Sequence, residues 1–416
     1  MNFNTEEYQK LAREKAYATP LTDFMMIDPS NFQNNSHWHY FERLRKEDPV
    51  HYCSESPVGP YWSVTKFNDI MHVDSNHEIF SSEKSITAFD PLDDFYLPNF
   101  IAMDPPKHDA QRKVVSPMFA PNNLAKLESL IRERAGKILD ELPLNETFDW
   151  VDRVSIELTT QMLATLFDFP WEDRRKLTYW SDITTAGPGN PLFVSIEHRR
   201  EQLIECVTYF TRLWNERVNE EPKGDLISML AHGEATRNMD MMEYLGNLIL
   251  LIIGGNDTTR NSITGGLLFL NQNPKEYAKL KANPKLVTSM VPEIIRYQTP
   301  LAYMRRTATV DTELGGKLIR KGDKVLMWYV SGNRDDEVIE NADAFIIDRE
   351  RPRQHLSFGF GIHRCVGNRL AEMQLTIIWE EILKRWELPE VVGDPKYVYS
   401  SFVKGYESLP VRINTI

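Results

Sequence analysis

The sequence predicts a mainly α-helical protein with small β-sheets, arranged as one domain over residues 1–416. Helical periodicity of apolar residues dominates from about residue 124 to 280, and one segment within it, 242–270, is long and mostly apolar. The first 35 residues form a polar lead-in. Strand-like runs are expected at 50–52, 61–64, 307–314 and 325–329, and residues 409–413 are expected to form an edge strand.

Composition and charge exclude several classes of protein. A chain of 416 residues with 42% hydrophobic content can bury a core large enough to enclose a cofactor. The net charge of −12 argues against nucleic acid as a partner. The polar, charged segment 1–13 has the features of neither a signal peptide nor a membrane anchor. Three cysteines without paired spacing indicate a reducing compartment, and we expect a cytoplasmic protein.

Paired glycines lie in the middle of the long apolar segment. Gly254 and Gly255 precede Asp257 and Thr258. A glycine inside a helix costs about 1 kcal/mol relative to alanine, so the pair needs a reason. One reason is close packing against another backbone. The other is a widened helical turn that leaves room for a ligand beside a carboxylate and a hydroxyl.

One cysteine, Cys365, lies in a glycine-rich stretch directly before a helix that is expected from Gly367 onward. The N-terminus of a helix favours a thiolate over a thiol. The glycines of 358–367 allow backbone N–H groups to point at the sulfur. His363 and Arg364 add positive charge nearby. The stretch is therefore suited to holding a sulfur anion.

Four roles for this sulfur compete. A buried structural cysteine needs no glycine loop. Zinc lacks ligands, because Cys53 and Cys206 are distant in sequence and show no Cys-x-x-Cys spacing. A nucleophilic cysteine needs a positioned base, and His363 is too close to Cys365 in sequence to be well placed as that base. The remaining role is that of an axial ligand to heme iron.

Residues 358–371 resemble the heme-binding signature of the cytochrome P450 family, Phe-Gly-x-Gly-x-His-x-Cys-x-Gly followed by Leu-Ala. The resemblance implies the cytochrome P450 fold. In that fold, heme b lies between a long central helix and a cysteine-bearing loop that precedes the proximal helix. It also implies Cys365 as the axial thiolate, with Phe358 and Gly367 in the same cofactor-binding loop.

The resemblance extends to the glycine pair of the central segment. It implies that Gly254 and Gly255 form an oxygen-binding groove, that Thr258 donates a hydrogen bond to dioxygen, and that Asp257 helps to relay protons. Cleavage of the O–O bond consumes protons inside a largely dry pocket, which is why such a pair is needed.

Further cofactor contacts follow from the same resemblance. Glu293 and Arg296 look like the family's Glu-x-x-Arg element, a structural pair on the proximal side of the heme, and Arg349 is the candidate for its third, basic partner. The two propionates of heme need cationic donors. His108 and Arg112 lie one helical turn apart, and Arg306 and His363 complete the set. His355 is interpreted equally as a propionate contact or as a staple of the backbone.

Four segments, 100–109, 254–262, 301–307 and 331–335, resemble the bacterial branch that hydroxylates the terminal carbon of medium-chain alkanes and fatty acids. Branches that act on linear monoterpenes of the linalool type or on sterol side chains are the alternatives. A peroxide-driven enzyme and a non-catalytic heme-thiolate sensor are less favoured alternatives for the function, since Asp257 and Thr258 favour a monooxygenase.

The substrate pocket is expected to be apolar, as an aliphatic guest requires. The cluster at 186–191, rich in proline and glycine, interrupts two helices and is interpreted as a lid over the channel, although an ordinary surface turn is nearly as good an interpretation. The candidate lining residues are Ile86, Phe89, Leu97, Leu250, Leu251, Ile253, Leu301, Met304, Phe402 and Val403.

Electrons are expected from a separate protein, because the chain carries no flavin or iron–sulfur motif. Positive charges near Arg364 and Arg369, with Arg112 and Lys113, would attract a small acidic ferredoxin supplied by a ferredoxin reductase. The expected small-molecule partners are dioxygen and the aliphatic substrate.

Overall fold

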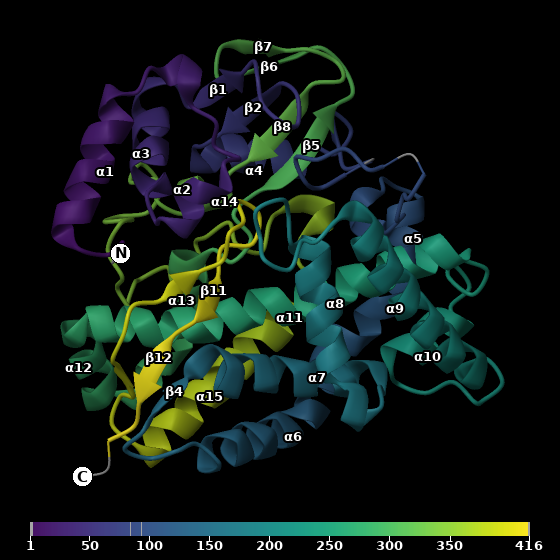
Figure 1. The fold of residues 1–416 in the computed structure, drawn as a ribbon. Coiled ribbons are helices and arrows are strands. Elements are labelled where there is room, and N and C mark those ends of the chain that lie inside the picture. The colour runs from purple at the N-terminus through teal and green to yellow at the C-terminus, as the bar shows by residue number, and fades with distance from the viewer. Residues whose placement is uncertain (1–2, 84, 93, 415–416) are drawn as a thin grey trace. The chain divides into compact units, whose positions relative to one another are not determined.

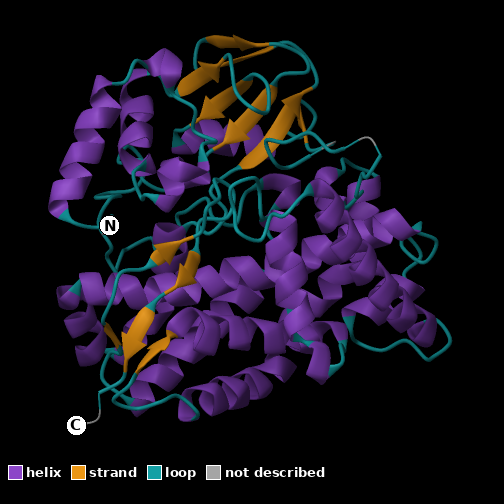
Figure 2. Ribbon diagram, viewed as in Figure 1, coloured by secondary structure: helices purple, strands orange, loops and turns teal. Residues whose placement is uncertain are grey.

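A computed structural model describes residues 3–83, 85–92 and 94–414. The chain divides into two compact units, each made of interleaved segments. Unit 1 comprises Met1–Asp90, Leu268–Cys365 and Gly393–Leu409, and unit 2 comprises Pro91–Leu267, Val366–Val392 and Pro410–Ile416. The single domain over 1–416 stays a prediction. Helices are the main element, and strands are short (Figures 1 and 2).

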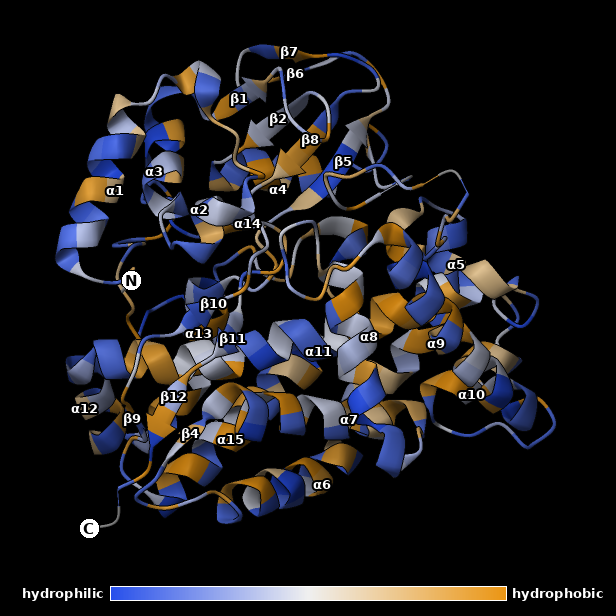
Figure 3. Ribbon diagram, viewed as in Figure 1, coloured by the Kyte–Doolittle hydropathy of each residue, from blue (hydrophilic) through white to orange (hydrophobic). Residues whose placement is uncertain are grey.

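Unit 1 contains a five-stranded sheet with the strand order β1-β2-β8-β5-β3. Strands β2 and β8 pair in parallel and the other neighbours pair antiparallel. Central strand β8 is hydrophobic over most of its length (Figure 3), and Val325, Leu326 and Met327 are buried on both faces of the sheet. The strands are β1 (Val50–Cys53), β2 (Tyr61–Val64), β3 (Phe80–Ser81), β5 (Met304–Ala308) and β8 (Lys324–Met327).

The remaining elements of unit 1 are helices and two hairpins. They are α1 (Glu6–Ala18), α2 (Pro29–Gln33), α3 (His37–Glu47), α4 (Phe67–Ser75), α12 (Pro274–Ala282), α13 (Val287–Gln298), α14 (Tyr329–Gly332), β6 (Thr312–Leu314), β7 (Lys317–Ile319), β10 (Lys396–Tyr397) and β11 (Tyr406–Ser408). The polar lead-in is folded here, because Ala16, Phe24 and Phe32 are buried in the core. Its first two residues, Met1 and Asn2, lie outside the described residues.

Two strand predictions for unit 1 need correction. The run at 307–314 is divided between β5 and β6, since Thr309–Asp311 separates them. The run at 325–329 ends at Met327, because Tyr329 already begins α14. In both places the pattern locates the strand but not the residue at which the strand ends.

Unit 2 is mainly helical and contains most of the long helix α11 (Met241–Gln272), which confirms the segment predicted at 242–270. Loop 186–195 does separate two helices, α8 and α9. The elements are α5 (Lys107–Val115), α6 (Pro121–Asp140), β4 (Thr147–Asp149), a π-helical turn at Val151–Ile156, α7 (Glu157–Phe167), α8 (Arg175–Thr185), α9 (Ile196–Arg217), α10 (Leu226–His232), α15 (Asn368–Arg385), β9 (Glu390–Val391) and β12 (Pro410–Arg412).

The C-terminal strand of unit 2 is central, so the prediction of an edge strand at 409–413 is wrong. Strand β12 pairs antiparallel with β4 on one side and with β9 on the other. Val411 is buried between Phe148 and Val391 in this register. Alternation of side chains shows that a segment is a strand, but it does not show how many neighbours pair with it.

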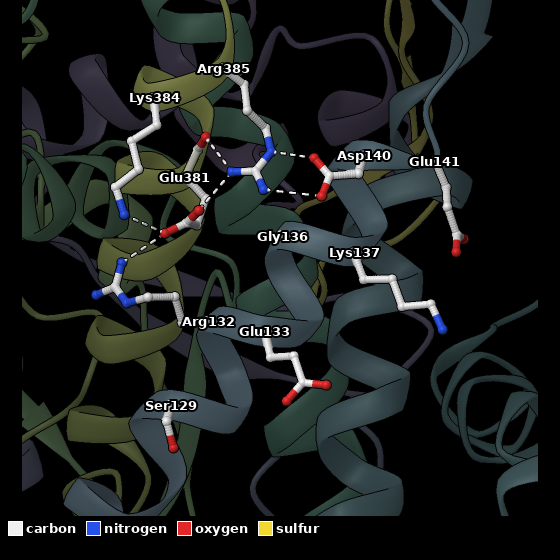
Figure 4. Close-up of a pocket in the computed structure, with 10 residues that line it drawn as sticks. All are labelled: Ser129, Arg132, Glu133, Gly136, Lys137, Asp140, Glu141, Glu381, Lys384 and Arg385. Carbon is white, nitrogen blue, oxygen red and sulfur yellow. Dashed lines mark hydrogen bonds and ion pairs between the residues drawn. The ribbon is translucent and has the colours of Figure 1, made fainter.

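Helices α6 and α15 of unit 2 are joined by ion pairs around Glu381. Arg132, Lys384 and Arg385 point toward this carboxylate from the two helices (Figure 4), with nitrogen–oxygen distances of 2.9, 2.6 and 2.6 Å. Arg385 also binds Asp140 of α6 at 2.8 Å. The three cations lower the pKa of Glu381 to about 2 against the opposing effect of burial. The network therefore anchors α15, whose N-terminus directly follows the cysteine loop.

Candidate functional site

The cysteine loop ends unit 1. Gly359 and Gly361 have φ values of +66° and +65°, which side chains rarely adopt. The backbone N–H of Cys365 donates to the carbonyl of Phe358 at 2.8 Å and closes the loop. Cys365 is exposed, whereas Cys53 and Cys206 are buried and burial raises the pKa of both thiols. Cys365 is thus the accessible sulfur among the three cysteines. Helix α15 begins at Asn368, with Gly367 as its N-cap residue, one residue after the predicted start.

Arg306 lies on β5 and is buried. Its guanidinium donates to Asp74 at 2.7 Å and to the carbonyl of Arg305 at 2.9 Å. Asp74 was not among the predicted residues, and its position on α4, far from Arg306 in sequence, explains why. The proposed contact of Arg306 with a propionate stays a prediction.

The two histidines of the cysteine loop are buried. The Nδ1 of His355 accepts from the backbone N–H of Ser357 at 3.2 Å, and its ring lies 5.4 Å from that of Phe358. Burial and the charges of Arg296, Arg364 and Arg353 lower the pKa of His355 to about 3. His355 is therefore neutral at pH 7 and its Nδ1 binds the backbone of Ser357, whereas its contact with a propionate stays a prediction. His363 lies in the short 3-10 turn Gly361–His363.

Glu293, Arg296 and Arg349 come together in unit 1. The guanidinium of Arg296 donates to both oxygens of Glu293 at 2.8 Å. Arg349 donates to Glu293 at 3.0 Å, so the third basic partner is present at the expected residue. Arg296 also donates to the carbonyls of Asn333, Ala342 and Ala344, which ties α13 to the segment that leads to the cysteine loop.

Within unit 2, one face of α11 is open. Every residue of α11 from Glu243 to Leu267 is buried except Leu250, Ile253, Gly254, Gly255 and Thr258. Gly254 and Thr258 are one turn apart, and no atom lies within 4 Å of the position that a Cβ would take at Gly254. Thr258 donates to the carbonyl of Gly254 at 2.8 Å. This face presents aliphatic groups and one hydroxyl.

The two glycines serve different purposes. A Cβ at Gly255 would lie 2.7 Å from a methyl group of Leu163 on α7, so this glycine allows close packing. The helix is α-helical throughout 241–272, and the expected widened turn is not found there. Room beside Thr258 comes instead from the missing side chain of Gly254.

Asp257 is fully buried and lies in a network with α8. One carboxylate oxygen accepts from Arg260 at 2.7 Å and from Asn256 at 3.0 Å, and the other accepts from Ser181 at 3.1 Å. Arg260 also binds Asp182 at 2.8 Å. Burial raises the pKa of Asp257 to about 6 even though Arg260 acts to lower it.

Asp257 and Thr258 therefore have different surroundings, although they were predicted as a pair. Thr258 lies on the open face, whereas Asp257 points toward α8. The sequence carried one signal of this network, the i, i+3 spacing of Asp257 and Arg260. Ser181 and Asp182 could not be predicted, because they come from a distant helix.

His108 and Arg112 lie one turn apart on α5, as expected. His108 is buried and its Nδ1 is 2.7 Å from Asp109. Burial lowers the pKa of His108, so the ring is neutral at pH 7. Of the two, only Arg112 offers a positive charge to a propionate.

The candidate lining residues fall into both units. In unit 1, Leu301 and Val403 form an isolated antiparallel bridge, and Ile86 accepts the backbone N–H of Arg305 through its carbonyl. Val403 in unit 1 and Leu251 in unit 2 are buried, at 2% and 8% exposure, which is the burial of core residues. Half-buried candidates are Ile86, Leu301, Met304 and Phe402 in unit 1 and Leu97, Leu250 and Ile253 in unit 2, while Phe89 is exposed.

Each unit by itself carries features that fit heme. Unit 1 has the accessible thiol and the buried cation Arg306. Unit 2 has open space beside Gly254 on α11 and, on α5, the cation Arg112. A thiolate suits iron, and guanidinium groups suit propionates.

Comparisons with known proteins decide the family. Residues 190–405 match the family model "Cytochrome P450". Linalool 8-monooxygenase of Pseudomonas putida is 35% identical over 384 residues, 89% of this chain and 94% of that protein. The chain belongs to the cytochrome P450 family.

Other P450 relatives agree in sequence and in fold. A methyl-branched lipid omega-hydroxylase of Mycobacterium tuberculosis is 32% identical, covering 89% of this chain and 90% of that one. The structure of cytochrome P450-153 from Novosphingobium aromaticivorans matches with a TM-score of 0.88 and 45% identity, over 95% and 100% of the chains. CYP153D17 from Sphingomonas sp. PAMC 26605 matches with a TM-score of 0.88 and 49% identity, over 93% and 98%.

The protein thus has the cytochrome P450 fold and is an O2-dependent monooxygenase with a heme held by a cysteine thiolate. The relatives carry names of enzymes that act on hydrophobic molecules, namely linalool and methyl-branched lipids. Among the described residues, none of the helices has the length and apolar character needed to span a bilayer.

Proposed function

We propose that this P450 hydroxylates the terminal carbon of medium-chain alkanes or fatty acids. The observation that carries the proposal is the open face of α11, where Leu250 and Ile253 flank Gly254 and Thr258. That face holds no ionisable group, which suits an unbranched aliphatic chain. Terminal attack must be imposed by shape, since a primary C–H bond is stronger than its secondary neighbour.

The resemblance of segments 100–109, 254–262, 301–307 and 331–335 to the alkane-hydroxylase branch supports the same substrate class. The omega-hydroxylase relative adds a precedent for attack at a chain end. The linalool-named relative supports the main alternative, a linear monoterpene, and a sterol side chain is the second alternative.

The residues would divide the work as follows. Cys365 would hold the heme iron through its thiolate, and the heme would supply the activation of dioxygen for insertion of one oxygen atom into a C–H bond. Thr258 would donate a hydrogen bond on the open face once its O–H leaves the carbonyl of Gly254. Asp257, whose pKa of about 6 lies close to neutral pH, would take up and release a proton and exchange it through Ser181.

We further propose that a ferredoxin and its reductase supply two electrons in the cytoplasm. Exposed cations adjoin the cysteine loop in sequence: Arg364 in unit 1 and Arg369 in unit 2, and Lys113 of α5 is exposed as well. Charge steering by such groups weakens as salt is added.

The test is a spectral titration of the purified protein with octane, octanoic acid, dodecanoic acid, linalool and a sterol, followed by product analysis. A low-spin to high-spin shift with the linear molecules and an ω-hydroxylated product are expected. A shift with linalool or the sterol alone would move the substrate to the corresponding alternative and contradict the proposal.

Matched variants locate the binding face. Ile253→Trp fills the open face of α11 and should abolish the shift with octane. Leu318→Trp, at an exposed position of β7, should leave the shift intact. An unchanged titration in Ile253→Trp would mean that the aliphatic chain does not lie along this face.

A further inference from the structure

Asp74 is a buried carboxylate in an unfavourable position. It lies next to the C-terminal residue of α4 and is 2% exposed. A negative charge near the C-terminus of a helix opposes the helix dipole, and removal from water adds a further cost. Such a group persists only when strong partners compensate it.

Three partners from three other segments meet this carboxylate. One oxygen binds the guanidinium of Arg306 at 2.7 Å. The other accepts from the phenol of Tyr329 at 2.8 Å and from the backbone N–H of Phe360 at 2.7 Å. Strand β5, helix α14 and the cysteine loop therefore converge on one side chain of α4, all within unit 1.

Two glycines of the cysteine loop, Gly359 and Gly361, allow its close approach to Asp74. A Cβ on Gly359 would lie 3.1 Å from the Asp74 carboxylate and 3.3 Å from the Tyr329 hydroxyl. A Cβ on Gly361 would lie 2.6 Å from the backbone oxygen of Asp74. The end of α4 thus occupies the space that side chains at these two positions would need, and the loop reaches Asp74 only because both residues are glycine.

We propose that Asp74 is a positioning residue for the heme site, which holds Arg306 and the cysteine loop in fixed relation to each other. Through Arg306 it acts on the group expected to bind a propionate, and through Phe360 it acts on the backbone that carries Cys365. Its negative charge also offsets the buried charge of Arg306. The inference rests on the assignment of Cys365 as the ligand and is independent of the substrate.

The experiment compares Asp74→Asn with the wild-type holoenzyme. Removal of a partner that orients a ligand typically weakens cofactor binding about 10- to 100-fold, so heme transfer to excess apomyoglobin should accelerate by about that factor. Loss of a negative charge beside Arg306 should also raise the midpoint potential of the iron. Asp69→Asn, a half-buried carboxyl on the same helix, should change neither quantity.

Tyr329→Phe separates the effect of hydrogen bonding to Asp74 from the effect of its charge. It also tests the positioning role if Asp74→Asn does not fold. It removes one hydrogen bond but keeps the charge, so heme loss should accelerate while the potential stays constant. Heme loss at the wild-type rate in Tyr329→Phe, or in a folded Asp74→Asn, would overturn the proposal. Cys365→Ser tests the ligand separately: survival of the thiolate-type band of the ferrous carbonyl complex there would refute the ligand assignment and not the role of Asp74.

Discussion

At the scale of the residue, the main lesson is that neighbouring side chains on a helix can belong to different environments. Asp257 and Thr258 are adjacent, yet one is fully buried against α8 and the other lies on the open face of α11. Successive residues of an α-helix point about 100° apart. A proton leaving Asp257 must therefore pass through other groups, of which Ser181 is in hydrogen-bond contact.

The raised pKa of Asp257 predicts a pH dependence of stability. The folded-state pKa of about 6 exceeds the unfolded value of about 3.9, so this carboxyl favours the folded state below about pH 4 and loses that contribution as the pH rises through 6. The carboxyl of Asp257 should lower the free energy of unfolding of the wild type by about 1–3 kcal/mol as the pH rises between these values, and Asp257→Asn should lack this decrease. Urea unfolding at several pH values measures it.

The control for this prediction is Asp152→Asn, because the carboxyl of Asp152 is exposed. Its stability should follow the wild-type pH curve. Parallel curves for the wild type and Asp257→Asn would contradict the prediction.

Thr258→Ala should uncouple the reaction. Without the hydroxyl, the open face of α11 loses the hydrogen-bond donor proposed to assist proton delivery to dioxygen. The product formed per dioxygen consumed should therefore fall by roughly tenfold. Thr259→Ala, at the next and fully buried position, should keep its coupling. Equal coupling in both variants would assign proton delivery to other groups.

At the scale of the element, the glycine pair of α11 allows a direct comparison. Gly254→Ala meets no atom and should stabilise the helix by about 0.5–1 kcal/mol while blocking the open face and reducing turnover. Gly255→Ala meets Leu163 at 2.7 Å and should destabilise the protein. Thermal unfolding of both variants provides the test, and stability changes of the same sign would contradict it.

The attachment of α15 to α6 predicts an acid-sensitive element. The folded-state pKa of Glu381, about 2, lies below the unfolded value of about 4.3, so its contribution is present above pH 4 and is lost as the pH falls toward 2. Glu381→Gln should cost about 1–2 kcal/mol at pH 7, because the partners are partly exposed and screened.

Glu133→Gln is the matched control for Glu381→Gln, because Glu133 of α6 lines the same pocket as Glu381 (Figure 4). Urea unfolding midpoints at pH 7, measured with and without 1 M salt, would report the contribution of the ion pairs to stability. Salt should reduce the difference between Glu381→Gln and the wild type. Equal midpoints for the two variants at pH 7 would mean that the ion pairs contribute nothing measurable.

At the scale of the whole molecule, Arg296 supports unit 1 from its centre. It makes five hydrogen bonds, to Glu293 and to three backbone carbonyls, while 1% exposed. Lysine has three donors and no planar fork, so Arg296→Lys should cost about 3–5 kcal/mol and lower the yield of folded holoenzyme. Arg320→Lys, in an exposed pair, should change the urea midpoint little; a wild-type midpoint in Arg296→Lys would contradict the prediction.

The sequence predicted the features that depend on local pattern. The long helix α11, the loop before α15 and the Glu293–Arg296 pair all follow from short-range spacing. Features that depend on distant partners were missed. Asp74 meets Arg306 across more than two hundred residues, and β12 acquires β4 and β9 as neighbours from separate parts of the chain. A periodic pattern identifies an element and carries no information about its contacts.

The interleaving of the two units has a consequence for biosynthesis. Unit 1 combines Met1–Asp90 with Leu268–Cys365 and Gly393–Leu409, and the segments between them belong to unit 2. A ribosome that adds about 5–20 residues per second makes Pro91–Leu267 of unit 2 before it reaches the second segment of unit 1. Strands β1, β2 and β3 must therefore wait for β5 and β8 before the five-stranded sheet of unit 1 can form.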